Sequence, residues 1–164
     1  MEYISAEEFL KQSKEVQKVL IDWYKPSEFD LYCFRNKKED NFKVHRVTEV
    51  DIEDNPYFLE NQLWFSKEKI IPLFTEEQLR KFIEDKTNSI IDIQHEVEEG
   101  YCFYLFRKST DILIQKYEEN LGHNLLKAYW KVACILIDEE ITNEKMKQNF
   151  IDSIHEIVNK KNNC

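Results

Sequence analysis

Apolar residues at helical spacing predict a helix at the N-terminus. They are Phe9, Val16, Val19, Leu20 and Trp23. Ser5 and Glu8 stand three apart, as in a capping box. Pro26 ends the pattern, because the residue before a proline is pushed away from helical backbone angles. We therefore expect one helix from about Ala6 to Trp23.

Short apolar runs beyond Pro26 predict a first hairpin. One strand covers Phe29 to Phe34, and a second covers Phe42 to Val50. The polar run from Arg35 to Asn41 joins them. Residues Asp51 to Leu73 show no clear period, so no element is predicted there.

A second hairpin is predicted from Ile91, Ile93 and His95, which share one face of a strand. Gly100 closes a short turn, because it can adopt a positive φ. The return strand, Tyr101 to Phe106, is apolar on both faces, so we expect both faces to be covered.

Four further helices follow from caps and spacing. Thr75 and Gln78 form a capping box for a helix that reaches about Asp85. A second helix follows Asp111 and reaches Glu119, where Leu121 and Gly122 break it. A third, buried helix covers Asn124 to Asp138. Thr142 caps the last helix, whose apolar stripe is Met146, Phe150, Ile154, Ile157 and Val158. A polar tail, Asn159 to Cys164, ends the chain.

These elements predict a single α+β domain over residues 1–164. Helices pack on an antiparallel sheet made of the two hairpins, and the buried helix near residues 124–138 lies at the centre. Residues 159–164 are expected to form a disordered tail. The length of 164 residues is typical of one domain.

Charge and hydropathy narrow the function classes. The chain has 32 acidic and 23 basic residues, a net charge of −9, which argues against broad binding to nucleic acid or anionic lipid. The longest nearly apolar stretch, Leu125 to Ile137, is too short for a membrane span. The acidic N-terminus does not resemble a secretory signal. We expect a soluble cytoplasmic protein.

No metal or cofactor is expected from the sequence. The cysteines are scattered, which favours reduced thiols; they are Cys33, Cys102, Cys134 and Cys164. The histidines are far apart along the chain; they are His45, His95, His123 and His155. The only glycines, Gly100 and Gly122, exclude phosphate-binding glycine motifs.

The usual catalytic constellations are missing, so a binding protein is favoured over an enzyme. The S-x-x-K pattern from Ser66 to Lys69 lacks its companion segments. The alternative is a small hydrolase whose Glu, His and Cys side chains converge only in space.

Four aromatics in the segment without clear period are the candidate partner-binding residues, since aromatics in irregular segments can anchor a partner. They are Tyr57, Phe58, Trp64 and Phe65. The alternative is that they cover the core from the side.

Three stretches of the chain resemble small phage and prophage proteins of low-GC Gram-positive bacteria. They are Ser5 to Phe34 with its Trp23-Tyr24-Lys25-Pro26, Ile70 to Asp85, and Leu121 to Ala133. The resemblance implies a phage accessory protein that binds a host or phage macromolecule, and it carries no catalytic residue.

The acidity then favours a basic protein partner, such as a host protein that handles nucleic acid. Two alternatives stay open. The net charge only keeps the domain soluble, or the protein is a homodimer that associates through Tyr57 to Phe65.

Overall fold

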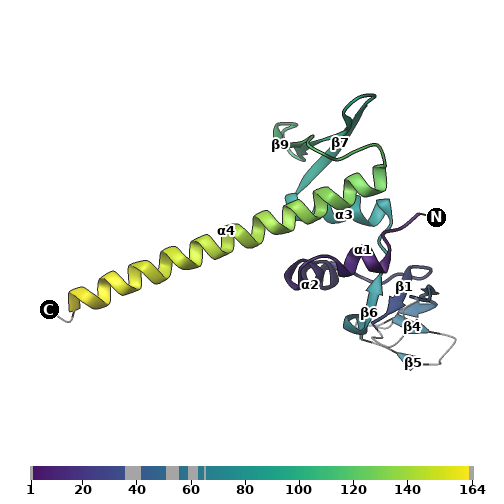
Figure 1. Cartoon of the computed structure of the whole chain (residues 1–164), viewed down its shortest axis with the longest axis horizontal. Helices are drawn as coiled ribbons and strands as arrows, with labels where there is room; N and C mark the ends of the chain where they lie inside the picture. Colours follow the sequence, from purple (N-terminus) through teal and green to yellow (C-terminus); the bar gives the residue numbers. More distant parts are fainter. Residues whose placement is uncertain (1, 36–41, 51–55, 59–62, 65, 163–164) are drawn as a thin grey trace.

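The computed structural model describes residues 2–35, 42–50, 56–58, 63–64 and 66–162. It contains helices and antiparallel three-stranded sheets, so the chain has an α+β fold (Figure 1). The two predicted hairpins lie in separate sheets, and each sheet is completed by a further strand. None of the described helices is long and apolar enough to cross a membrane.

The N-terminal helix is broken in two, and the expectation of one continuous helix is wrong. α1 spans Ala6–Leu10 and α2 spans Lys14–Trp23. Ser13 caps α2 by accepting a hydrogen bond from the N–H of Val16 at 3.2 Å. The buried Gln17 side chain donates to the Gln12 carbonyl at 2.8 Å, which satisfies a backbone group at the break.

The first predicted hairpin forms, but its second strand is short. β1 (Leu31–Phe34) is the middle strand, between β2 (His45–Arg46) and β6 (Ile70–Pro72). The other piece of the predicted strand, β3 (Glu49–Val50), belongs to a second sheet. Between the two pieces the buried Val47 turns inward, and its N–H donates to the carbonyl of Asp30 at 2.8 Å.

The segment without a predicted element contains short strands. β4 (Pro56–Phe58) pairs with β3 and with β5 (Leu63–Trp64). The 3-10 helix η1 (Lys67–Lys69) then leads into β6. Such short strands are stable only as part of a larger sheet, which explains why no alternation of apolar and polar residues predicts them.

The second predicted hairpin is confirmed. β7 (Ser89–Glu96) and β8 (Gly100–Arg107) pair in register, and Gly100 has a φ of 90°. The segment after Asp111, predicted as a helix, is instead β9 (Leu113–Tyr117), because it pairs with the free edge of β8.

One face of β8 packs on the core, and the outer surface of the β7–β8–β9 sheet is only partly covered. The Phe103 ring packs edge-on against Tyr129 of α4, with ring centroids 4.8 Å apart. On the outer face of this sheet Ile90, Leu113 and Ile114 are exposed. The expectation that both faces of Tyr101 to Phe106 are covered holds for that strand, because none of these residues is exposed; the open outer surface belongs to the neighbouring strands β7 and β9.

Two further helices complete the fold. α3 (Glu76–Thr87) begins at the predicted capping box, in which Thr75 and Gln78 bond reciprocally. α4 (Leu125–Asn162) continues through Thr142 and does not begin a new helix there, because Ile141 packs on the core and no breaker interrupts the following turn. It remains helical as far as Asn162, within the expected tail.

The first half of α4 is the buried helix that the sequence predicts. It runs past the β7–β8–β9 sheet on one side and α1 and α2 on the other (Figure 1). Its buried residues are Leu126, Ala128, Tyr129, Trp130, Val132, Ala133 and Ile137.

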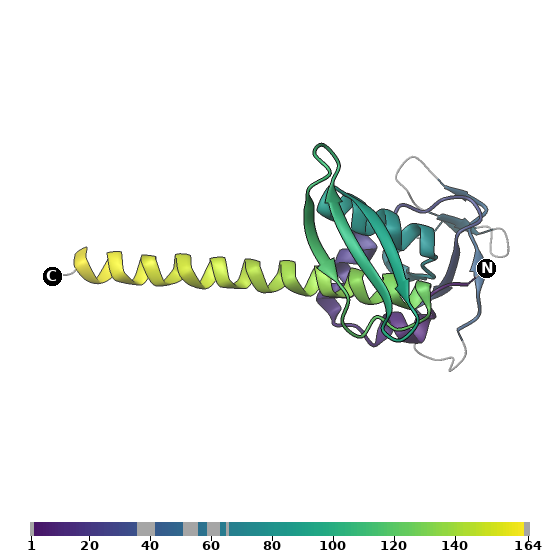
Figure 2. The same cartoon turned by 90° about the horizontal axis from the view of Figure 1, so that it is seen from above.

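The second half of α4 leaves the body of the protein. Residues 142–151 are all exposed, and both Figure 1 and Figure 2 show the helix extending into solvent as far as its end. We call residues 142–162 the projecting segment. At about 1.5 Å per residue it is about 30 Å long.

Candidate functional site

A cleft of about 660 Å³ lies where the end of α2, the loop into β1 and one side of α3 meet. This volume falls within the range of known ligand sites. The cleft is lined by Trp23, Tyr24, Lys25, Ser27, Glu28, Phe29, Asp30, Leu31, Thr75, Glu77, Gln78, Lys81 and Asp85.

The loop that forms one wall of the cleft is held by the carboxylate of Asp30. It accepts hydrogen bonds from the Ser27 N–H at 2.9 Å and from the Tyr24 hydroxyl at 3.0 Å. Burial raises the pKa of Asp30, and these two hydrogen bonds partly offset that shift. Burial, together with the neighbouring Asp30, also raises the pKa of Tyr24. Tyr24 is therefore a neutral hydrogen-bond donor at physiological pH.

Phe29 sits in this loop with an unusual backbone. Its φ is 74°, a conformation that costs a bulky residue about 1–3 kcal/mol. The conformation is fixed because its N–H donates to the Val47 carbonyl at 2.9 Å. The ring is 67% exposed. Among the side chains that the structure describes, only Phe29 and Phe150 are aromatic rings of this exposure.

The opposite wall combines an aromatic ring with a carboxylate. Trp23 packs edge-on against Phe82, with ring centroids 5.1 Å apart. Its indole Nε1 donates to Asp85 at 3.2 Å. This bond joins α2 to α3 and fixes both the ring and the carboxylate at the cleft.

Acidic side chains outnumber basic ones around the cleft. Glu28, Asp30, Glu77 and Asp85 line it together with Lys25 and Lys81. Within the described part of the chain, Glu28 and Glu77 make no ion pair. The cleft can therefore offer carboxylates to a cationic group.

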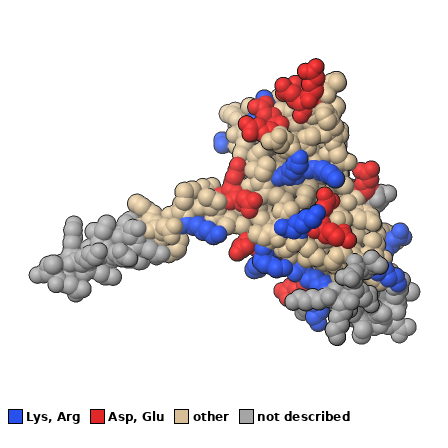
Figure 3. All heavy atoms as spheres, in the orientation of Figure 1, with Lys and Arg blue, Asp and Glu red and all other residues tan. Residues whose placement is uncertain are grey.

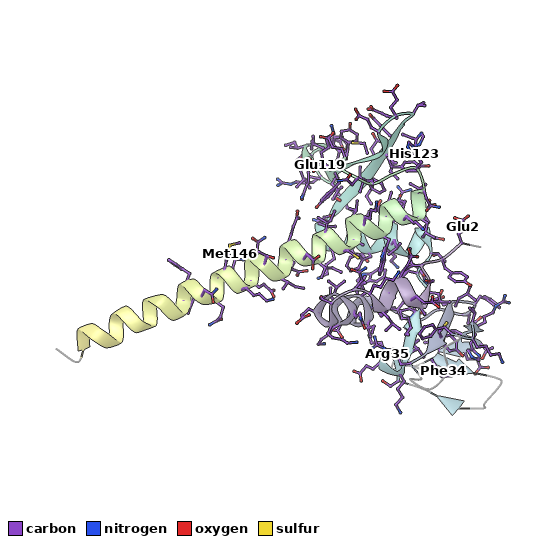
Figure 4. All side chains as sticks on the ribbon, viewed as in Figure 1. Glu2, Phe34, Arg35, Glu119, His123 and Met146 are labelled. Carbon is purple, nitrogen blue, oxygen red and sulfur yellow. The ribbon has the colours of Figure 1, made fainter. Side chains whose placement is uncertain are left out.

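The projecting segment offers a different kind of surface. Met146, Phe150 and Ile151 are 57%, 68% and 45% exposed. Met146 and Phe150 are four residues apart and share one side of α4, and Ile151 widens this apolar surface. Figure 4 shows Met146 pointing into solvent beyond the body. The sequence continues this spacing with Ile154, Ile157 and Val158.

The predicted aromatic anchors lie apart from both surfaces. Tyr57 and Phe58 are in β4, and Trp64 is in β5, where it pairs with Tyr57. Phe65 lies outside the described residues. The backbone thus brings three of the four onto neighbouring strands, at the far side of the body from the projecting segment (Figure 1).

Two of the four histidines meet at the turn end of the β7–β8 hairpin. His95 Nε2 and His123 Nδ1 are 3.2 Å apart, a hydrogen bond in which one ring donates. Figure 4 places His123 at this end of the sheet. The described residues hold no group of three or more side chains that could bind a metal ion.

The cysteines of the described chain are free and partly or fully buried. Burial raises the pKa of Cys33 to about 11 and that of Cys134 to about 12. Nucleophilic cysteines need the opposite shift, so these two thiols are suited to packing.

Sequence reasoning missed the cleft. Trp23-Tyr24-Lys25-Pro26 was the one visible signal, as a helix end rich in aromatics. The residues of the cleft that face this helix end come from α3, more than fifty positions later, and no local sequence pattern predicts that contact.

In comparisons with known proteins, no family model, no curated protein and no solved structure matches the chain.

Proposed function

We propose that this protein acts in the cytoplasm by binding another protein through the apolar side of its projecting segment. The observation that carries the proposal is the continuation of α4 beyond its last buried residue, Ile137, with Met146, Phe150 and Ile151 exposed. An amphipathic helix that lays its apolar side into a groove is a common mode of protein recognition.

The unfavourable free energy of an unpacked helix with exposed apolar side chains supports this proposal. Helix stability in proteins comes mainly from packing, and residues 142–151 of the projecting segment are all exposed. Three large apolar side chains on two consecutive turns also add an exposed patch. A partner that covered them would offset both costs.

The proposed setting is that of a phage or prophage accessory protein acting on a host protein. The resemblance of three stretches to phage proteins supports this setting. The charge supports a basic partner only in part, because Lys and Arg are interspersed with Asp and Glu on the face shown in Figure 3. Steering of the acidic chain toward a basic surface would raise the association rate more than the affinity.

A second candidate is self-association through the same segment. The projecting segment is nearly neutral, while the rest of the chain carries the excess of acid. Its charged residues are Glu144, Lys145, Lys147, Asp152, Glu156, Lys160 and Lys161. Two copies would therefore meet with least repulsion along their projecting segments.

Analytical ultracentrifugation of the wild type and of two single variants tests the proposal. Phe150→Glu places a charge on the apolar side, and Lys145→Glu places the same charge on the opposite side. A dimer that only Phe150→Glu dissociates supports self-association. If the wild type is a monomer, the proposal requires a different protein as the partner. A pull-down must then recover that partner with the wild type and with Lys145→Glu as bait, but not with Phe150→Glu. Equal behaviour of both variants in both assays contradicts the proposal.

A further inference from the structure

We propose that the cleft between α2 and α3 is a binding site for an arginine side chain presented by a protein partner. The site shares no residue with the projecting segment, so the inference stands independently of the proposed function. It names the chemistry of one contact rather than the identity of the partner.

Charge is the first reason for a cationic ligand. Four carboxylates and two lysines line the cleft. Asp30 and Asp85 are already oriented by hydrogen bonds from Tyr24 and Trp23, whereas Glu28 and Glu77 make no ion pair within the described chain. The two oriented carboxylates and the two without an ion pair together favour a cation and repel phosphate.

The aromatic walls favour arginine among cations. Phe29 and Trp23 line the cleft beside these carboxylates. A guanidinium stacks on an aromatic face and forms paired hydrogen bonds to a carboxylate, and it is more weakly hydrated than the ammonium of lysine. A lysine side chain could use the charge but not the planar geometry.

The backbone of Phe29 holds its side chain in an exposed position at the cleft. A φ of 74° strains a bulky residue, and the ring that this strain presents is 67% exposed. Neither the strain nor the exposure stabilises the isolated chain. Glycine would accept this φ without strain. Strained residues of this kind cluster at ligand sites, where the geometry serves recognition.

The size of the cleft sets the form of the ligand. A volume of about 660 Å³ exceeds that of one arginine side chain and leaves room for the neighbouring residues of a peptide. The side chains of Lys25 and Lys81 border the same space. They favour a single arginine with neutral neighbours over a run of basic residues, because additional cations would be repelled.

The test uses NMR titration of the full chain with the blocked tripeptide acetyl-Ala-Arg-Ala-amide. The same peptide with citrulline, which has nearly the same shape without the charge, is the ligand control. Trp23→Phe assigns the Trp23 indole N–H signal. We expect the arginine peptide to shift that signal and the Phe29 amide with a measurable Kd, and the lysine peptide to bind more weakly. The citrulline peptide should leave both signals unmoved.

Protein variants distinguish binding in the cleft from attraction of the peptide to the acidic surface as a whole. Phe29→Gly should weaken binding of the arginine peptide at least tenfold while the spectrum remains that of the folded protein, since glycine suits the backbone. Glu77→Gln should weaken it severalfold. Glu98→Gln, which removes an exposed acid at the β7–β8 turn, should have no effect. Equal shifts with arginine and citrulline, or wild-type affinity in both Phe29→Gly and Glu77→Gln, would overturn the inference.

Discussion

The contact between Gly100 and Gly122 gives a sharp test of the fold, because one glycine needs both its φ and its space, while the other needs only its φ. Gly100 has a φ of 90°, and a Cβ built on it would lie 2.4 Å from the carbonyl oxygen of Gly122. Gly122 has a φ of 76°, and a Cβ built on it would meet no atom within 4 Å. The matched pair Gly100→Ala and Gly122→Ala therefore isolates the clash.

The expected losses follow from these geometries. Alanine at a positive φ costs about 1–2 kcal/mol, and this applies to both variants. In Gly100→Ala the backbone must also move away from Gly122, which breaks the 2.9 Å hydrogen bond from the Tyr101 N–H to the Gly122 carbonyl. That loss adds about 1 kcal/mol or more. We predict a loss of about 2–4 kcal/mol for Gly100→Ala and about 1–2 kcal/mol for Gly122→Ala.

Thermal unfolding followed by circular dichroism measures the difference. For a chain of this size 1 kcal/mol corresponds to about 2–4 °C, so Gly100→Ala should lower the Tm by about 5–15 °C. Alanine restricts the unfolded chain equally in both variants, so that effect cancels in the comparison. Equal Tm values for the two variants would show that the hairpin does not pack against the segment before α4.

Three further predictions concern the core, a cap and the cleft. Ala133→Asp buries an unpaired charge in α4 and should cost several kcal/mol, so near-normal thermal unfolding would show that this helix is not central. Ser13→Ala removes the cap of α2 and should lower the free energy of unfolding by about 1 kcal/mol in urea titrations. Asp30 has a raised pKa in the folded protein, so its ionisation disfavours folding, and stability should fall as pH rises from about 4 through that pKa. The free energy of unfolding of Asp30→Asn should therefore increase relative to that of the wild type as the pH rises, as measured by urea unfolding from pH 3.5 to 7. A difference between the two proteins that does not change with pH would refute the raised pKa of Asp30.

Local patterns predicted the elements whose stability is local. The capping box at Thr75, the positive φ of Gly100 and the apolar first half of α4 each depend on residues close in sequence, and each is present in the structure. The fold class follows from these elements.

Elements whose conformation depends on a particular partner rather than on the spacing of apolar residues were not predictable in the same way. The segment of β9 was expected to belong to a helix after Asp111; its pairing with the edge of β8 decides its conformation instead. The break at Ser13 depends on Gln17 reaching back to the carbonyl of Gln12. The continuity of α4 through Thr142 reflects the packing of Ile141, which outweighs a weak capping signal.

The candidate sites show the same division. The stripe with Met146 and Phe150 was visible from spacing, but its exposure depends on where the body ends. The cleft joins Trp23 to Asp85 across 62 positions, so no spacing rule could predict it. The aromatic segment with Tyr57 was chosen from composition alone.

Site-specific photo-crosslinking in bacterial cells tests the central claim, that the projecting segment binds protein. Benzoylphenylalanine replaces Phe150 in one variant and Lys145, on the opposite side of α4, in a second. We predict a defined crosslinked product from position 150, either with a second copy or with one other protein, and none from position 145. The absence of a crosslinked product at position 150, or the same products from both positions, would contradict the claim.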